Sequence, residues 1–288
     1  MQGKSWFRML SLIIGFAFLY IPIASLIVYS FNASKLVTVW GGFSTKWYGE
    51  LLRNDQILNA AWLSLRVAAI SATISVILGT LAGMVLARFG PFKGRTLFSG
   101  LTTAPLVMPE VITGLSLLLL FVTMEQLIGW PAGRGMTTII ISHVTLTMAF
   151  VTVLVQSRLT QMDESLEEAA LDLGARPWKV FFLITLPIIF PALLSGWLLA
   201  FTLSLDDLVI ASFVAGPGSS TLPMVIFSKV RLGVSPDINA LATILVVVVA
   251  IGVAIAGVMM TRQQKARDRD AQMALAANQQ MIESVKKG

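Results

Sequence analysis

The stretch ESLEEAALDLGARPWKVFFLITLP, residues 164–187, is a charged interruption between long apolar runs. Its first half repeats apolar residues at three- and four-residue spacing, as one face of a helix does: Leu166, Ala169, Ala170 and Leu173. Gly174 comes next, where a left-handed residue that ends a helix needs no Cβ. Pro177 suits the first turn of a following helix, because its missing N–H would be unpaired there. The stretch therefore predicts two short helices around a tight turn.

The same stretch carries a spaced motif, which reads Glu168-Ala169-Ala170, three residues, Gly174, nine residues, Ile184, one residue and Leu186-Pro187. This full register resembles the EAA loop of the membrane subunits of bacterial ABC importers. In that family the loop is the coupling helix that docks in a cleft of the ATPase subunit. The resemblance implies an ATPase-coupling role for Glu168, Ala169, Ala170, Gly174, Ile184, Leu186 and Pro187. The alternative is an amphipathic cytoplasmic loop, residues 158–187, that packs only on its own bundle.

The composition indicates a membrane protein. Of the 288 residues, 56% are hydrophobic and 12% are charged, whereas soluble domains carry about 25% charged residues. The absence of cysteine excludes disulfides, thiolate metal sites and cysteine nucleophiles. The net charge of +6 does not indicate nucleic-acid binding, because the positive residues flank the apolar runs.

Six apolar runs are long enough to span a membrane, since 20 residues of helix cross a hydrocarbon layer of about 30 Å. Their approximate limits are 10–31, 63–86, 97–124, 137–157, 188–211 and 238–260. The first run is too long for the apolar core of a signal peptide, so we expect it to be retained. The sequence thus predicts an all-α membrane protein with six transmembrane helices in residues 1–261, followed by a charged cytoplasmic tail, 262–288, to which we assign no function.

The distribution of positive charge predicts the orientation. If the N-terminus is cytoplasmic, 14 of the 21 Lys and Arg residues fall in the inside segments and seven fall outside. Cytoplasmic loops carry the excess of positive residues in membrane proteins. We therefore expect both termini, and the loop 158–187, in the cytoplasm of a bacterium, with the chain in its inner membrane.

Carboxylates inside the apolar runs are costly and mark candidate functional sites. Glu110 lies near the middle of the third run, beside Pro105 and Pro109, which bend or break a helix. Asp206 and Asp207 lie towards the outer end of the fifth run. A passage with these three carboxylates would favour cations.

Each carboxylate also has a structural alternative. Glu110 would instead face a cytoplasmic cavity or pair with a residue of another subunit. Asp206 or Asp207 would pair with Arg66 or cap the broken end of a helix. The one histidine, His143, is interpreted as structural, because a single histidine cannot form a His-Glu-x-x-His zinc site.

Three smaller features predict local structure. Gly79 and Gly83 form a G-x-x-x-G pair that allows close helix packing. Residues 216–218, Gly-Pro-Gly, have turn chemistry. The tryptophan-rich outer segment 31–62 is either a helix lying at the membrane interface or a contact surface for an external partner.

The chain contains no P-loop and no Gly-x-Ser-x-Gly nucleophile motif. We therefore expect no ATP site, no cofactor, no metal and no enzymatic activity in this chain. Two other functions stay open on the residues alone. The first is a stand-alone cation channel or ion-coupled carrier. The second is an intramembrane enzyme, which is the less favoured of the two because the sequence offers no nucleophile–base or metal pair.

Beyond the EAA loop, most of the chain resembles the permease subunits of polyamine ABC importers, over residues 29–55, 103–121 and 201–243. The resemblance implies a type I importer fold and a heterodimer with a second, related permease. It also implies two ATPase subunits, which hold ATP and Mg²⁺, and a periplasmic polyamine-binding protein. The expected cargo is putrescine, with spermidine or another cationic solute as the alternative.

Overall fold

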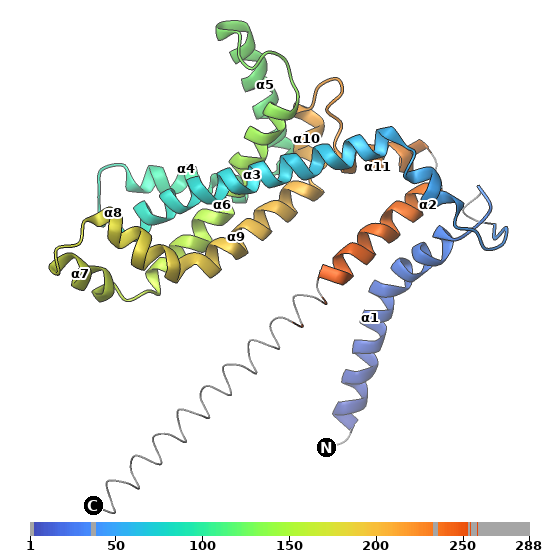
Figure 1. Cartoon of the computed structure of the whole chain (residues 1–288), viewed down its shortest axis with the longest axis horizontal. Helices are drawn as coiled ribbons and strands as arrows, with labels where there is room; N and C mark the ends of the chain where they lie inside the picture. Colours follow the sequence, from blue (N-terminus) through green and yellow to red (C-terminus); the bar gives the residue numbers. More distant parts are fainter. Residues whose placement is uncertain (1–2, 36–38, 233–235, 253, 255–257, 259–288) are drawn as a thin grey trace, which may run out of the picture. The chain divides into compact units, whose positions relative to one another are not determined.

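The computed structural model describes residues 3–35, 39–232, 236–252, 254 and 258. The chain divides into two compact units, one formed by Asn54–Leu232 and the other by Met1–Arg53 with Gly233–Gly288. The described residues are helical and contain no strand, so the all-α prediction is confirmed (Figure 1). The predicted tail, 262–288, and the end of the predicted sixth span lie outside the described residues.

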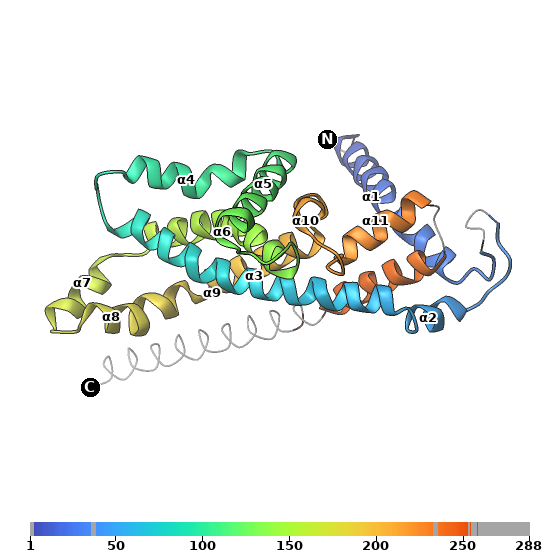
Figure 2. The ribbon, with the colours of Figure 1, turned by 90° about the horizontal axis from the view of Figure 1, so that it is seen from above.

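Three long helices form the core of the larger unit: α3 (Asp55–Arg88), α6 (Met136–Thr160) and α9 (Leu186–Asp206). They pack side by side, as the two perpendicular views show (Figures 1 and 2). Apolar side chains from all three meet in one cluster, which includes Ala72, Val151, Val155, Leu159, Ile189 and Leu193. The Asn54 side chain accepts a hydrogen bond from the Ile57 N–H at 3.2 Å and so begins α3 with a cap.

The predicted glycine pair sets how closely α3 approaches α6. A Cβ on Gly79 would lie 2.8 Å from the Val151 side chain, and one on Gly83 would lie 3.1 Å from the Thr152 carbonyl oxygen. Both distances are shorter than ordinary Cβ contacts, so any larger residue would require its neighbour on α6 to shift. The G-x-x-x-G prediction of close packing is therefore confirmed, and α6 is the partner.

The third apolar run, 97–124, is broken, so the expectation that its prolines bend or break a helix is confirmed. The structure divides it into α4 (Arg95–Val107) and α5 (Glu110–Ile128). Met108 is extended at φ −75° and ψ 136°, because the ring of a following proline disfavours the helical conformation. Pro109 thus sets the break, whereas Pro105 lies inside α4.

The predicted fifth span, 188–211, also ends too late. The α9 helix stops at Asp206, Asp207 is extended, and a separate helix, α10, covers Val209–Val214. A turn at Gly216–Ser219, with the Ser219 N–H bonded to the Gly216 carbonyl at 3.1 Å, then leads to α11 (Leu222–Leu232). The predicted Gly-Pro-Gly turn is confirmed.

Five helices of the described residues are long and apolar enough to cross a membrane: Trp6–Ser30, Asp55–Arg88, Glu110–Ile128, Met136–Thr160 and Pro177–Asp206. The sixth predicted span corresponds to the apolar helix Pro236–Gly252, which is shorter within its described residues. The count of six therefore stays a prediction.

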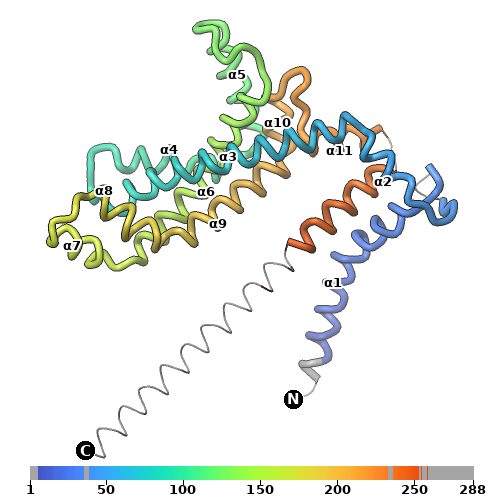
Figure 3. The backbone as a smooth tube through the Cα atoms, in the orientation of Figure 1, coloured from blue at the N-terminus to red at the C-terminus, as the bar shows by residue number. Residues whose placement is uncertain are grey.

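Between α6 and α9 the chain forms α7 (Ser165–Asp172), α8 (Pro177–Val180) and one π-helical turn, η1 (Phe181–Thr185). These elements lie at one end of the α3–α6–α9 bundle, where the tube in Figure 3 reverses direction. The prediction of two short helices around a turn is confirmed.

The smaller unit contains α1 (Gly3–Ser30), α2 (Lys46–Leu51) and the helix Pro236–Gly252. Its loop is organised by Asn32, whose Oδ1 accepts the Gly41 N–H at 2.8 Å and whose carbonyl accepts the Trp47 indole N–H at 2.6 Å. Trp47 is buried and Trp62 belongs to α3, so the prediction of one interfacial helix over 31–62 is wrong. The alternative, an external contact surface, stays a prediction.

Gly79→Leu should lower the thermal stability of the helix bundle, because a larger side chain forces α3 away from Val151. Overpacking of this kind costs about 1–3 kcal/mol. The measurement is the unfolding midpoint of the purified protein in detergent, followed by tryptophan fluorescence. Gly15→Leu in α1 is the control, because a Cβ there meets nothing within 4 Å. Equal midpoints for the two variants would contradict the close packing.

Candidate functional site

The turn between α7 and α8 has a defined backbone structure. Gly174 has φ +82°, its N–H donates to the Leu171 carbonyl at 2.9 Å, and the Ala175 N–H donates to the Ala170 carbonyl at 3.0 Å. These two bonds form a Schellman motif, which satisfies the last carbonyls of a helix and needs a left-handed residue. The predicted role of Gly174 as the end of the first helix is confirmed.

The second helix of the pair is continuous with a long apolar helix. Pro177 lies at the start of α8, and the chain then remains helical from Pro177 to Asp206. The π-helical turn accommodates Pro187, which has no N–H to donate, and the Leu186 N–H donates to the Phe181 carbonyl instead. Ile184 and Leu186 of the motif are half-buried in this segment. The α8 helix is therefore continuous with α9.

The α7–α8 hairpin presents an apolar tip to its surroundings. No side chain of α7 is buried, and Leu173 and Trp178 are 90% and 57% exposed. Glu168 and Ala169 are exposed too, whereas Ala170 is half-buried. The alternative, a loop that packs only on its own bundle, stays open, although the apolar stripe of α7 is mostly uncovered. Exposed apolar patches of this kind mark interaction sites.

One interaction that the sequence did not predict holds α7 in place. Arg88, the last residue of α3, lies with its Nη1 2.8 Å from Glu164 Oε1 and its Nε 2.9 Å from Glu167 Oε2. The Thr185 hydroxyl donates to the other oxygen of Glu167 at 2.5 Å. A basic residue at the end of one helix also suits the acidic first turn of another. This charge complementarity was the only sequence feature that pointed to the contact, and it could not show that Arg88 pairs with residues so far along the chain.

The segment before α7 is also fixed by hydrogen bonds. The Ser165 N–H lies 3.0 Å from Asp163 Oδ1, and together with the Ser165 hydroxyl it lowers the pKa of the Asp163 carboxyl below its usual value. Hydrogen bonds to an ionised carboxylate favour that form. Asp163 thus begins α7 as a charged acceptor.

The three carboxylates proposed for a cation path occupy the two helix breaks. Glu110 is the first residue of α5, directly after the break at Pro109, and is exposed. Asp206 ends α9 and is exposed, and Asp207 is buried. The two breaks are neighbours, because α5 packs on α10 at Gly114, where a Cβ would lie 2.7 Å from the Phe213 ring.

Asp207 satisfies the first backbone groups of α10. Its Oδ1 accepts the Ile210 N–H at 3.3 Å, and its Oδ2 accepts the Ala211 N–H at 2.7 Å. The structure thus confirms one of the two structural alternatives for Asp207, a cap at a broken helix.

His143 completes this buried cluster. Its Nε2 lies 3.1 Å from Asp207 Oδ2, and its Nδ1 lies 2.6 Å from the Ser204 hydroxyl. Because a carboxylate only accepts, His143 donates from Nε2, and in a neutral ring Nδ1 accepts from Ser204. His143 therefore ties α6 to the break between α9 and α10, which is the structural role expected for it.

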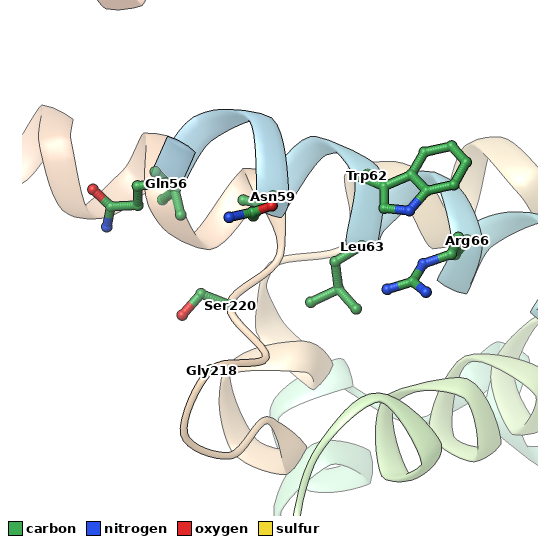
Figure 4. Close-up of a pocket in the computed structure, with 9 residues that line it drawn as sticks. Gln56, Asn59, Trp62, Leu63, Arg66, Gly218 and Ser220 are labelled. Atoms are coloured by element: carbon green, nitrogen blue, oxygen red, sulfur yellow. The ribbon is translucent and has the colours of Figure 1, made fainter. Parts of the chain in front are cut away.

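Arg66 lies in a different place from the carboxylates. Figure 4 shows it in a cavity of about 470 Å³ with Trp62 and Asn59 of α3 and with the loop residues Gly218 and Ser220. Its guanidinium carbon is 5.7 Å from the centre of the Trp62 ring, a cation–π distance. Within the part of the chain that the structure describes, Arg66 forms no ion pair, so the suggested pairing with Asp206 or Asp207 is wrong.

Metal binding has no support in the described residues, which contain no group of three His, Asp or Glu side chains placed to hold an ion.

Comparison with known proteins shows which family the chain belongs to. Residues 76–269 match the family described as binding-protein-dependent transport system inner membrane component. The chain belongs to this family. It is 61% identical, over 94% of its length and 96% of the relative's, to the "Putrescine transport system permease protein PotI" of Escherichia coli (strain K12). It is 44% identical, over 81% and 85% of the two lengths, to the "Spermidine/putrescine transport system permease protein PotC" of the same organism.

Solved structures support the fold of this permease. A bacterial ABC transporter involved in the import of the polysaccharide alginate aligns with a TM-score of 0.70 at 19% identity, over 91% of this chain and 96% of that chain. The MetNI methionine transporter aligns with a TM-score of 0.58 at 17% identity, over 76% and 98%. The permease is therefore a multi-pass inner-membrane protein with the fold of ABC importer membrane subunits.

Asp207→Ala should destabilise the permease by about 3 kcal/mol, because it leaves buried N–H groups of α10 and His143 without their acceptor. Asp207→Asn, which keeps one acceptor oxygen, should cost less. The unfolding midpoint in detergent measures both. Asp206→Asn is the control, since that side chain is exposed, and a midpoint no lower for Asp207→Ala than for this control would refute the capping role.

Proposed function

We propose that this permease is one membrane subunit of an ATP-driven importer that moves polyamine, putrescine first, from the periplasm to the cytoplasm. The observation that carries the substrate is the 61% identity over nearly the whole length to a putrescine permease. Spermidine is the alternative cargo, because the 44% identical relative is named for both amines.

The α7–α8 hairpin is the proposed coupling element. Its apolar tip around Leu173 is uncovered, beside the exposed carboxylate of Glu168, and a docking cleft on an ATPase would bury both. ATP and Mg²⁺ belong to that partner. The hairpin and both termini then lie in the cytoplasm, in line with the distribution of Lys and Arg.

The complete importer requires further subunits. We propose a heterodimer with a related permease, two ATPase subunits and a periplasmic polyamine-binding protein. A solved structure of the same fold supports the binding-protein part of this proposal, since that alginate transporter is described in complex with an alginate-bound periplasmic protein. The outer loops, which include the turn at Gly216–Ser219, are the proposed contact for the binding protein.

The helix breaks are the proposed passage for the amine. Glu110 and Asp206 are exposed at adjacent breaks, so their carboxylates are available to a cation. Asp207 is buried and has an indirect role, because its carboxylate accepts a backbone N–H at the start of α10. Scattered carboxylates give weak binding, which suits rapid release better than a closed cage does.

The decisive experiment is a pull-down of the tagged permease in mild detergent, assayed for co-purifying ATPase with and without putrescine-loaded binding protein. Stimulation by the putrescine-loaded protein alone is expected. ATPase that responds to the spermidine-loaded protein instead changes the cargo. A complete absence of ATPase favours the rival, a stand-alone cation channel or carrier whose flux follows a gradient.

Glu168→Ala and Gly174→Val should each reduce putrescine uptake at least tenfold while membrane insertion is intact. The first removes an exposed docking carboxylate, and the second forces a β-branched residue to φ +82°, a conformation that costs about 1–2 kcal/mol for residues with a Cβ. Radiolabelled uptake and immunoblotting of membranes measure the two quantities. Asp163→Asn and Gly100→Val are the controls, because Asn retains the capping oxygen and a Cβ at Gly100 meets nothing. Normal uptake by both test variants would remove the coupling role.

Asp206→Asn and Glu110→Gln should lower polyamine flux without lowering the amount of assembled complex, because each removes one negative charge from an exposed break. Flux is measured in proteoliposomes at several concentrations of putrescine. Glu125→Gln, in α5 but a different part of that helix, is the matched control. If both test variants transport at the normal rate, the acidic passage is wrong.

A further inference from the structure

The attachment of α7 to the rest of the bundle is polar. No side chain of α7 is buried, so apolar packing does not fix its position. Four side chains provide the contact instead, and we call them the Arg88 clasp: Arg88, Glu164, Glu167 and Thr185. Through the clasp, α7 touches the end of α3 and the π-helical turn that begins α9.

The two acidic members of the clasp differ in their surroundings. The side chains of Arg88 and Glu167 are only 13% and 18% exposed, whereas Glu164 is 61% exposed. The Arg88–Glu167 contact is an ion pair by its 2.9 Å distance, although the Nε–H is not aligned for a hydrogen bond. Low exposure limits screening by salt, so this pair contributes more than the Glu164 pair.

Glu167 occupies a branching position. One of its oxygens meets Arg88 of α3 and the other accepts from Thr185, which precedes α9. Its neighbour Glu168 is exposed, because successive residues of a helix point about 100° apart. Glu168 is thus more exposed than Glu167, although both line the hollow that also contains Arg88 and Thr185.

We propose that Arg88 and Glu167 are positioning residues that transmit the displacement of α7 to α3 and α9 during transport. The inference rests on the proposed function, in which an ATPase moves the hairpin. The α8 helix reaches α9 directly through the chain, but α3 is covalently remote from the hairpin and is reached through Arg88. Both α3 and α9 pack in the same core, so the clasp lets one movement act on two of its three helices.

The test measures putrescine transported per ATP hydrolysed by the complete complex in proteoliposomes. Arg88→Gln and Glu167→Gln should each lower this ratio about tenfold, in the range of known coupling mutations, while the ATPase rate stays at the unmodified level. Arg158→Gln is the control, because it removes a positive charge from an exposed site at the same end of the bundle and should leave the ratio unchanged.

Two further variants separate transmission from simple damage. Arg88→Lys keeps the charge and should restore part of the ratio. The double variant Arg88→Gln/Glu167→Gln should be no worse than either single change, because the two residues act as one unit. Additive losses, or a normal ratio in Arg88→Gln, would overturn the clasp.

Separate measurements distinguish a failure of assembly from a failure of coupling. Subunit stoichiometry after purification shows whether a variant assembles, and if Arg88→Gln does not, Glu167→Gln decides by the same ratio. If the unmodified complex transports putrescine with ATP hydrolysis and the variants show the same ratio, the proposed role of the clasp is wrong but the proposed function stands. An unmodified complex without ATPase sinks the proposed function instead.

Discussion

A helix that ends inside a hydrocarbon layer must satisfy its own backbone groups, because no water is there to do so. The break between α9 and α10 obeys this constraint through Asp207, which accepts two N–H groups of α10 and the ring N–H of His143. Since His143 belongs to α6, the core helix and the break are fixed together. The position of the exposed carboxylate of Asp206 follows from that anchor.

The rest of the bundle depends on how closely its helices approach. Gly79 and Gly83 let α3 lie against α6, and Gly114 lets α5 lie against α10. Small residues are the usual means of tight packing where lipid offers no hydrophobic driving force. Close contact of this kind leaves the core helices little room for local deformation.

Sequence reasoning succeeded where the chemistry was local. The positive φ of Gly174 and the start of α8 at Pro177 both followed from neighbours in the chain. It failed where the decision was non-local. Pro105 and Pro109 obey the same local rule, yet only the second sets a break, and hydropathy continues past Asp206 because it does not register a cap. The pairing of His143 with Asp207 spans 64 residues and left no local signal.

The uncovered tip of the α7–α8 hairpin also affects how the chain behaves when no partner is bound to it. Leu173 is 90% exposed, and an apolar side chain left uncovered in water promotes self-association. If the hairpin docks as proposed, the same apolar tip makes the chain prone to aggregate whenever its partners are scarce.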